Sequence, residues 1–213
     1  MNEPTVQILC CLLIGYLLGC FSPSYLIGRL RGYDVRRAGS GNAGASNTVI
    51  LAGKAAGFAV ALTDILKTAA AWWLCRRLFP LLRLAGAIAG VAALIGHMFP
   101  VFLRFRGGKG LACLGGLALA WDWRLLLAML CVALLIGLIT DYVWISTVSM
   151  SLIFPLTLGL LTRDWALAAV LTVPAIPIFW KHLENFRRMR EGKELRLSFL
   201  WNRDQELKRI GID

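Results

Sequence analysis

Long apolar runs alternate with short polar links along the whole chain of 213 residues. A helix needs about 20 apolar residues to cross the hydrocarbon core of a bilayer, and most of the runs approach or exceed that length. The pattern predicts seven transmembrane helices, at about 6–30, 54–78, 84–103, 110–120, 125–140, 143–161 and 165–181. The expected fold class is therefore all-α, a polytopic membrane protein with short links between its helices.

The two ends of the chain depart from this pattern. Met1–Thr5 contains Glu3 and no positive charge, so the basic region of a signal peptide is missing and the first apolar run is expected to remain in the protein. We expect residues 1–194 to form the transmembrane domain and residues 195–213 to form a basic tail. Apolar and basic residues mix in this tail, which suits a helix in the membrane interface, and a solvated tail is the alternative.

The composition is typical of a membrane protein and limits the classes of partner that we expect. Hydrophobic residues make up 58% of the chain and charged residues 16%, whereas soluble domains carry about 25% charged residues. The formal net charge is +11, a balance that suggests nucleic acid or anionic lipid as a partner. The basic residues lie in the links and the tail, so we expect phospholipid headgroups and phosphorylated substrates as partners, and no nucleic acid.

The distribution of lysine and arginine predicts the orientation in the membrane. The links at 29–48, 104–109 and 141–142, with the tail from Lys181, fall on one side and carry 16 of the 23 basic residues, against 5 on the other side. Cytoplasmic loops carry the excess of positive charge. We therefore expect the N-terminus outside, and the C-terminus and the polar links in the cytoplasm.

The first polar motif is GSGNAGASN, Gly39–Asn47, which follows Arg36 and Arg37. Glycine can turn its N–H inward where a Cβ would clash, and consecutive N–H groups can form a concave anion site. Nearby arginines make phosphate the expected anion, so the motif predicts a phosphate-holding loop beside the membrane. Its glycine spacing also matches the dinucleotide fingerprint, but that fingerprint needs a preceding strand, and here a membrane helix precedes.

The second motif is Gly107-Gly108-Lys109-Gly110. It is not a P-loop, because the position that needs a further glycine holds Leu103 and the residue after the lysine is not Ser or Thr. A lysine framed by glycines at the start of a helix can still hold a phosphate against backbone N–H groups. The alternative is a tight, positively charged link with no binding role.

The third motif runs from His182 to Arg188. On a helix His182, Asn185 and Arg188 share one face, and Glu184 can pair with Arg188 four residues later. The alternative is a solvated helix end. Because all three motifs fall on the same side of the membrane, we expect them to form one site.

The chain shows neither an activated nucleophile nor the spacing of a metal site. Its six cysteines lie in apolar stretches and are interpreted as packing residues, so we expect no metal and no cofactor. If the site transfers an acyl group, the donor must arrive activated, and the protein would orient the reactants and neutralise charge. Asp64 and Lys67 in the second run are interpreted as a buried ion pair, with substrate contact as the alternative, and His97 as a packing residue.

At these three motifs the sequence resembles the bacterial acyl-phosphate-dependent glycerol-3-phosphate acyltransferases, seven-helix enzymes of the inner membrane. DVRRAGSGNAGASN, GHMFPVFLRFRGGKG and HLENFRRMREGKE are similar to the family's three motifs, and the likeness runs from about Gly15 to Glu194. It implies transfer of a fatty acyl group from acyl phosphate to sn-glycerol 3-phosphate. The products would be phosphate and lysophosphatidic acid for phospholipid synthesis, with no metal, cofactor or acyl-enzyme.

The resemblance also implies roles for individual residues. The acyl-phosphate end is assigned to Ser40, Gly41, Asn42, Gly44 and Asn47. The acceptor phosphate is assigned to Lys109 with Gly107 and Gly108, and Thr147 takes the place of a family serine. His182 and Asn185 are the catalytic residues together with Ser40, supported by Glu184 and Arg188. Either His182 or the acceptor's own phosphate could take the proton.

Several positions differ from the family pattern. Ile50 stands where the family usually has an arginine that holds the acceptor phosphate, and losing that contact would cost about 2–3 kcal/mol unless Arg36, Arg37 or Lys54 replaces it. Asp141 and Trp144 stand where the family often has arginine and serine.

Two other functions therefore remain as alternatives. One is a divergent lipid-binding paralogue with a different acceptor. The other is a transporter of phosphate or a phosphorylated small molecule, against which no inverted repeat is visible and the polar groups gather on one face.

Overall fold

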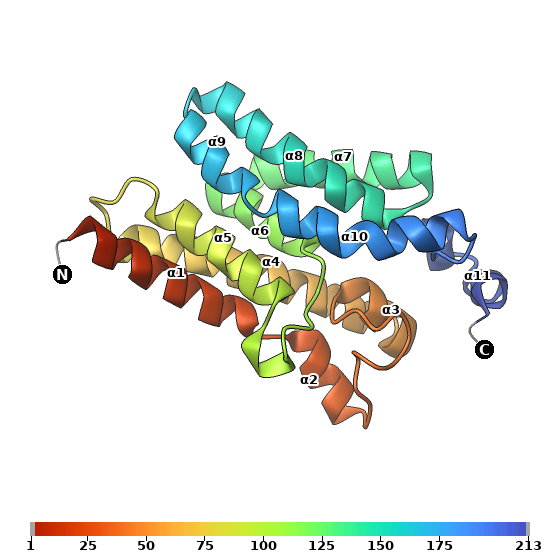
Figure 1. Ribbon diagram of the computed structural model, residues 1–213. Helices are drawn as coiled ribbons and strands as arrows, with labels where there is room; N and C mark the ends of the chain where they lie inside the picture. Colours follow the sequence, from red (N-terminus) through yellow and green to blue (C-terminus); the bar gives the residue numbers. More distant parts are fainter. Residues whose placement is uncertain (1–2, 212–213) are drawn as a thin grey trace.

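The structure is a computed structural model that describes residues 3–211, and every regular element in that range is a helix. Figure 1 shows the long helices packed side by side as a bundle, with the short α2, α3 and α11 gathered toward one end. The elements in order are α1 Pro4–Cys20, α2 Pro23–Leu30, α3 Ala45–Ala52, α4 Lys54–Leu78, α5 Ala85–Met98, η1 Val101–Leu103, α6 Leu111–Trp121, α7 Trp123–Thr140, α8 Val143–Thr162, α9 Trp165–Thr172, α10 Ala175–Arg190, η2 Leu197–Leu200 and α11 Arg203–Ile210.

All seven predicted apolar runs are helical, which confirms the fold class. Six helical segments of the described chain are long and apolar enough to span a membrane, and α6 is a shorter apolar helix. The first run divides into α1 and α2 at Phe21, because Ser22 caps the new helix by accepting from the Tyr25 N–H and Pro23 occupies its first position. The seventh run divides at Val173 and Pro174 into α9 and α10.

Small side chains let the helices approach closely in the N-terminal half of the bundle. Ala85, Ala89 and Ala93 of α5 are fully buried in a cluster with Cys11 of α1 and Cys75 of α4. Without a hydrophobic driving force between lipid-exposed helices, this close packing supplies much of the attraction. A second cluster, with larger residues such as Leu117 and Phe154, joins α4–α6 to α7–α10.

The C-terminal tail is folded against the helical body over its described residues, 195–211. The Leu197 N–H donates to the Asp141 carbonyl at 2.7 Å, and the Ser198 N–H donates to the Asp141 carboxylate at 2.9 Å. Arg209 of α11 donates to the carbonyls of Gly192 and Glu194. Asp141 is therefore the residue that anchors the tail. The predicted domain boundary at residue 194 separates two segments that pack together.

Candidate active site

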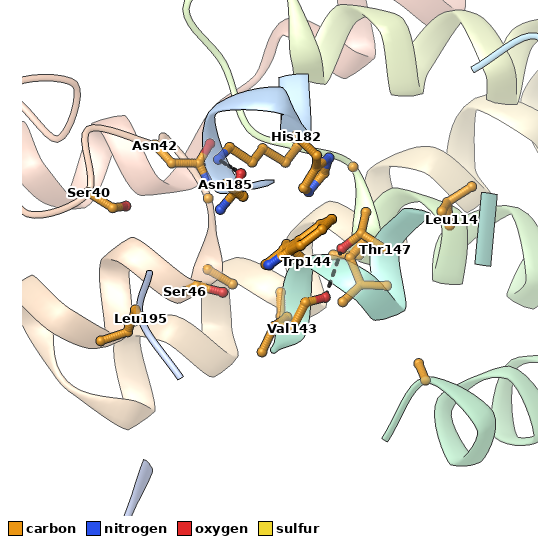
Figure 2. Close-up of a pocket in the computed structure, with 18 of the residues that line it drawn as sticks. Ser40, Asn42, Ser46, Leu114, Val143, Trp144, Thr147, His182, Asn185 and Leu195 are labelled. Carbon is orange, nitrogen blue, oxygen red and sulfur yellow. Dashed lines mark hydrogen bonds between the residues drawn. The ribbon is translucent and has the colours of Figure 1, made fainter. Parts of the chain in front are cut away.

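One cavity of about 520 Å³ lies where the three motifs meet, at the end of the bundle that carries α3 and α11. Figure 2 shows Ser40, Asn42, Trp144, His182 and Asn185 around it. The candidate residues that line the cavity are Ser40, Asn42, Gly44, Lys109, Thr147, His182, Asn185 and Arg188. Five other candidates do not line the cavity, and their contacts explain why. They are Gly41, Asn47, Gly107, Gly108 and Glu184.

Asn47 shapes the first motif from behind. Its buried side chain accepts from the Ser40 N–H at 2.8 Å and donates to the carbonyls of Val35 and Ala38, each at 3.0 Å. Gly41 has a positive φ of 71°, a conformation that glycine adopts without a steric penalty. Both residues therefore position the loop, and the neighbouring Ser40, Asn42 and Gly44 line the cavity instead.

The loop leads directly into a helix start at the cavity wall. Gly44 is the N-cap residue of α3, and Ala45 and Ser46 in its first turn line the cavity. The first-turn N–H groups of a helix have no partner within the helix, and they favour an anion. Within the loop, the N–H groups of Gly41 and Gly44 already donate to the carbonyls of Ala38 and Asn42, so the predicted phosphate-holding role rests on the first turn of α3.

The second motif corrects one expectation. The N–H groups of Gly107 and Gly108 do not face a phosphate, because they donate to the carbonyls of Met98 and His97, each at 3.1 Å. Glycine is needed here for close packing, since a Cβ at either position would overlap His97.

Lys181 fixes this motif from the other side and was not predicted. Its ammonium donates to the carbonyls of Met98, Gly107 and Gly108 at 2.6, 3.1 and 3.0 Å. A signal was present, because this lysine directly precedes the histidine of the third motif. Its three bonds attach the second motif to α10.

Lys109 reaches from the second motif to the third. Its ammonium donates to the Asn185 side-chain oxygen, and it lines the cavity beside Arg188. Burial first, and then the positive charge of Arg188, lower the pKa of Lys109 to about 8, while Glu194 opposes that shift. The site therefore carries a cation that a bound phosphate would stabilise.

The third motif forms a hydrogen-bonded network around Glu194, a buried residue that sequence reasoning did not identify as functional. Asn185 donates its amide to Glu194, and Arg188 donates to the same carboxylate at 3.0 Å. Glu184 is exposed and pairs with Arg188 at 3.4 Å from outside the cavity. The glutamates therefore support the arginine and asparagine, which face the cavity.

His182 is held in one orientation. Its ring is 3% exposed, and Nδ1 lies 2.7 Å from the Ile178 carbonyl. A carbonyl can only accept, so Nδ1 carries the hydrogen and Nε2 keeps its lone pair. The Trp144 ring stacks on the imidazole with the centroids 6.4 Å apart.

The position that differs most from the family pattern is in the cavity wall. Ile50 is 8% exposed and lines the cavity. Thr147 also lines it, and its hydroxyl donates to the Val143 carbonyl at 3.3 Å. Arg36 does not replace the missing arginine there, because it pairs with Asp34 at 2.6 Å and donates to the Leu103 carbonyl.

The predicted pair of Asp64 and Lys67 is a buried charge cluster that also includes His97. Lys67 Nζ lies 2.7 Å from the Asp64 carboxylate and 3.1 Å from His97 Nδ1, and it donates to the Phe21 carbonyl. Asp64 and His97 line the cavity, so His97 is more than the packing residue expected. The lysine already neutralises the carboxylate from within the protein.

Comparison with known proteins places these observations in a family. A family model described as glycerol-3-phosphate acyltransferase matches residues 9–192. Glycerol-3-phosphate acyltransferase 1 of Oceanobacillus iheyensis is 34% identical, covering 90% of this chain and 95% of its own. Its Deinococcus radiodurans namesake is 38% identical, covering 91% and 98%.

Solved structures extend the likeness to three dimensions. The chain is similar to the crystal structure of PlsY, an integral membrane glycerol 3-phosphate acyltransferase, in its glycerol 3-phosphate form. The TM-score is 0.82 at 31% identity, covering 91% of this chain and 96% of that one. The lysophosphatidic acid form gives a TM-score of 0.76 at 31% identity, covering 89% and 94%.

Proposed function

Since the chain belongs to the family of integral membrane glycerol-3-phosphate acyltransferases, we propose that its cavity transfers a fatty acyl group from acyl phosphate to sn-glycerol 3-phosphate. The observation that carries this proposal is the composition of the cavity. Its lining combines polar residues, such as Ser40, Lys109 and His182, with apolar residues of α6 and α7. A phosphorylated head group and a fatty acyl chain are the two parts of an acyl phosphate.

The donor would bind with its phosphoryl group on the first motif. Ser40, Asn42 and the first turn of α3 face that position, and the helix start favours negative charge. The acyl chain would extend between α6 and α7, where Leu114 and Met129 line the cavity. The carbonyl would then lie between the first motif and these apolar residues.

The acceptor would bind through its phosphate to Lys109 and Arg188, two of the cations that line the cavity and close enough for the charge of Arg188 to act on Lys109. Gly107 and Gly108 contribute by holding Lys109 in place. The Thr147 hydroxyl retains lone pairs that can accept from an acceptor hydroxyl. The site thus separates a donor phosphate subsite from an acceptor phosphate subsite.

The reaction moves one proton from the acceptor hydroxyl to the departing phosphate, in two transfers through His182, and needs no covalent enzyme intermediate. The acceptor hydroxyl oxygen attacks the acyl carbon, an ester bond forms, and the bond from that carbon to the phosphate oxygen breaks, releasing phosphate. His182 Nε2, with its lone pair free, accepts the hydroxyl proton and returns it to the departing phosphate. Asn185 positions Lys109 through its oxygen and keeps a second amide hydrogen for the developing oxyanion.

The experiment uses purified protein in bilayer nanodiscs with palmitoyl phosphate and glycerol 3-phosphate. Phosphate and lysophosphatidic acid should appear in equal amounts, and Lys109→Ala should abolish both. Release no greater than that of Lys109→Ala would end the proposal. Uptake of phosphate into sealed liposomes without any ester product would favour the transporter instead.

We further propose that the site faces the cytoplasm. Figure 1 shows the start of α1 at one end of the bundle, and α2, α3 and α11 toward the other. That second end carries most of the lysine and arginine, which remain on the cytoplasmic side of membranes. Protease added to inside-out vesicles should cut the C-terminal tail, and an uncut tail would contradict this orientation.

A further inference from the structure

The wall of the cavity holds a buried hydrogen-bond donor that no role above uses. Trp144 lies in the first turn of α8 and lines the cavity. Its indole nitrogen is fully buried and has no hydrogen-bond partner. Among the described residues 3–211, one other buried side-chain donor has no partner, the Trp72 indole nitrogen, and Trp72 does not line the cavity.

The ring is held firmly, so the nitrogen has a fixed direction. Trp144 stacks on His182 with an interplanar angle of 26° and meets the edge of Phe186 at 83°. Figure 2 shows its nitrogen on the side of the ring toward Ser46 and Asn185, away from Thr147. In that view the N–H edge of the ring is turned toward the space between the start of α3 and the third motif.

An unpaired buried N–H is costly, and a rigid one is a preorganised binding group. Leaving a buried donor without an acceptor costs about 1–3 kcal/mol, and each such group in a native structure calls for an explanation. An indole N–H can only donate, so its missing partner is an oxygen that accepts. The proposed donor substrate places phosphoryl and carbonyl oxygens in this space.

We propose that Trp144 binds the acyl donor, by donating its Nε1–H to an oxygen of the acyl-phosphate head group. This inference rests on the proposed function and adds a residue to it. The tryptophan supplies a donor on an extended ring that also stacks on His182. A bond to the carbonyl oxygen would act mainly in the transition state, whereas a bond to a phosphoryl oxygen would act in the bound substrate as well.

The test removes the N–H and keeps the ring. Trp144→Phe retains an aromatic stack, and replacing Trp144 with benzothienylalanine preserves the indole shape with sulfur in place of N–H. Both variants should lower kcat/KM for palmitoyl phosphate about 10- to 100-fold, the value of a hydrogen bond to a charged acceptor. The KM for glycerol 3-phosphate should stay unchanged. Trp123→Phe is the matched control, because Trp123 is exposed and does not line the cavity.

The pattern of constants identifies the oxygen and can overturn the inference. A fall in kcat with constant KM for the donor indicates the carbonyl, and a rise in that KM indicates a phosphoryl oxygen. The inference fails if kcat/KM for the donor matches that of Trp123→Phe, or if the loss falls on the KM for glycerol 3-phosphate. The proposed function fails separately, if the unsubstituted protein releases no phosphate at all. The benzothienylalanine protein keeps these outcomes decisive should Trp144→Phe fold poorly.

Discussion

At the scale of single residues, the charge of Lys109 should set the upper pH limit of acceptor binding. Its pKa is lowered to about 8, so the amine loses its charge as pH rises through that value, and attraction for the acceptor phosphate is lost with it. The kcat/KM for glycerol 3-phosphate should therefore fall above pH 8, as steady-state rates across pH would show.

A lysine-to-arginine exchange provides the control for this pH dependence. Lys109→Arg keeps a charged group throughout the range, so its profile should lack the fall near pH 8. An identical fall in both proteins would assign the titration to another group.

Ile50 offers a second test on the acceptor side. The residue lines the cavity at the position where the resemblance implies an arginine, so Ile50→Arg should add a charged contact to the acceptor phosphate. A hydrogen bond to a charged group contributes about 1.5–3 kcal/mol, and the KM for glycerol 3-phosphate should drop at least about tenfold. Ile50→Met is the size-matched control, and equal KM values for the two variants would show that the position does not contact the acceptor.

At the scale of elements, α10 holds the second motif through one side chain. Lys181→Met removes three hydrogen bonds to the carbonyls around Gly107 and Gly108, so the link that carries Lys109 loses its support. We expect kcat/KM for glycerol 3-phosphate to fall about 10- to 100-fold while the KM for palmitoyl phosphate changes little. Lys208→Met is the control, since that lysine is exposed and does not line the cavity, and equal losses for both substrates would argue for general unfolding.

The elements themselves were largely predictable, and their interruptions were not. Seven apolar runs specify helices because a bilayer leaves few other solutions. Pro23 and Pro174 were visible in the sequence, but proline is tolerated in membrane helices. Neither proline was therefore enough to predict that the helix is interrupted there. The site was predictable in its motifs. The use of each N–H was less predictable, because Asn47 binds the Ser40 N–H and the carbonyls of Met98 and His97 bind those of Gly107 and Gly108.

At the scale of the whole molecule, the C-terminal tail completes the cavity. Leu195, Arg196 and Ile210 line it, and Arg209 holds the backbone carbonyl of Glu194. A chain ending at residue 194 retains all its spans and should insert in the membrane, but we expect it to lose at least about tenfold in phosphate release, because breaking bonds to a charged group costs about 1.5–3 kcal/mol.

The comparison for this truncation is Lys208→Ala in the full-length chain, since Lys208 is exposed. Rates should be measured in the same nanodiscs for both proteins. A truncated protein as active as Lys208→Ala would show that the tail is not part of the site.

The three carbonyls gathered around the Lys181 ammonium have a thermodynamic consequence for ligand binding. Because three hydrogen bonds already fix the link that carries Lys109, it has little conformational entropy left to lose when the acceptor binds. The free-energy cost of ordering this link on binding should therefore be small. Amide hydrogens of Gly107 and Gly108 should accordingly exchange slowly without substrate, and saturating glycerol 3-phosphate should barely slow them further. In this protein, Lys181 would preorganise the acceptor subsite without contacting either substrate.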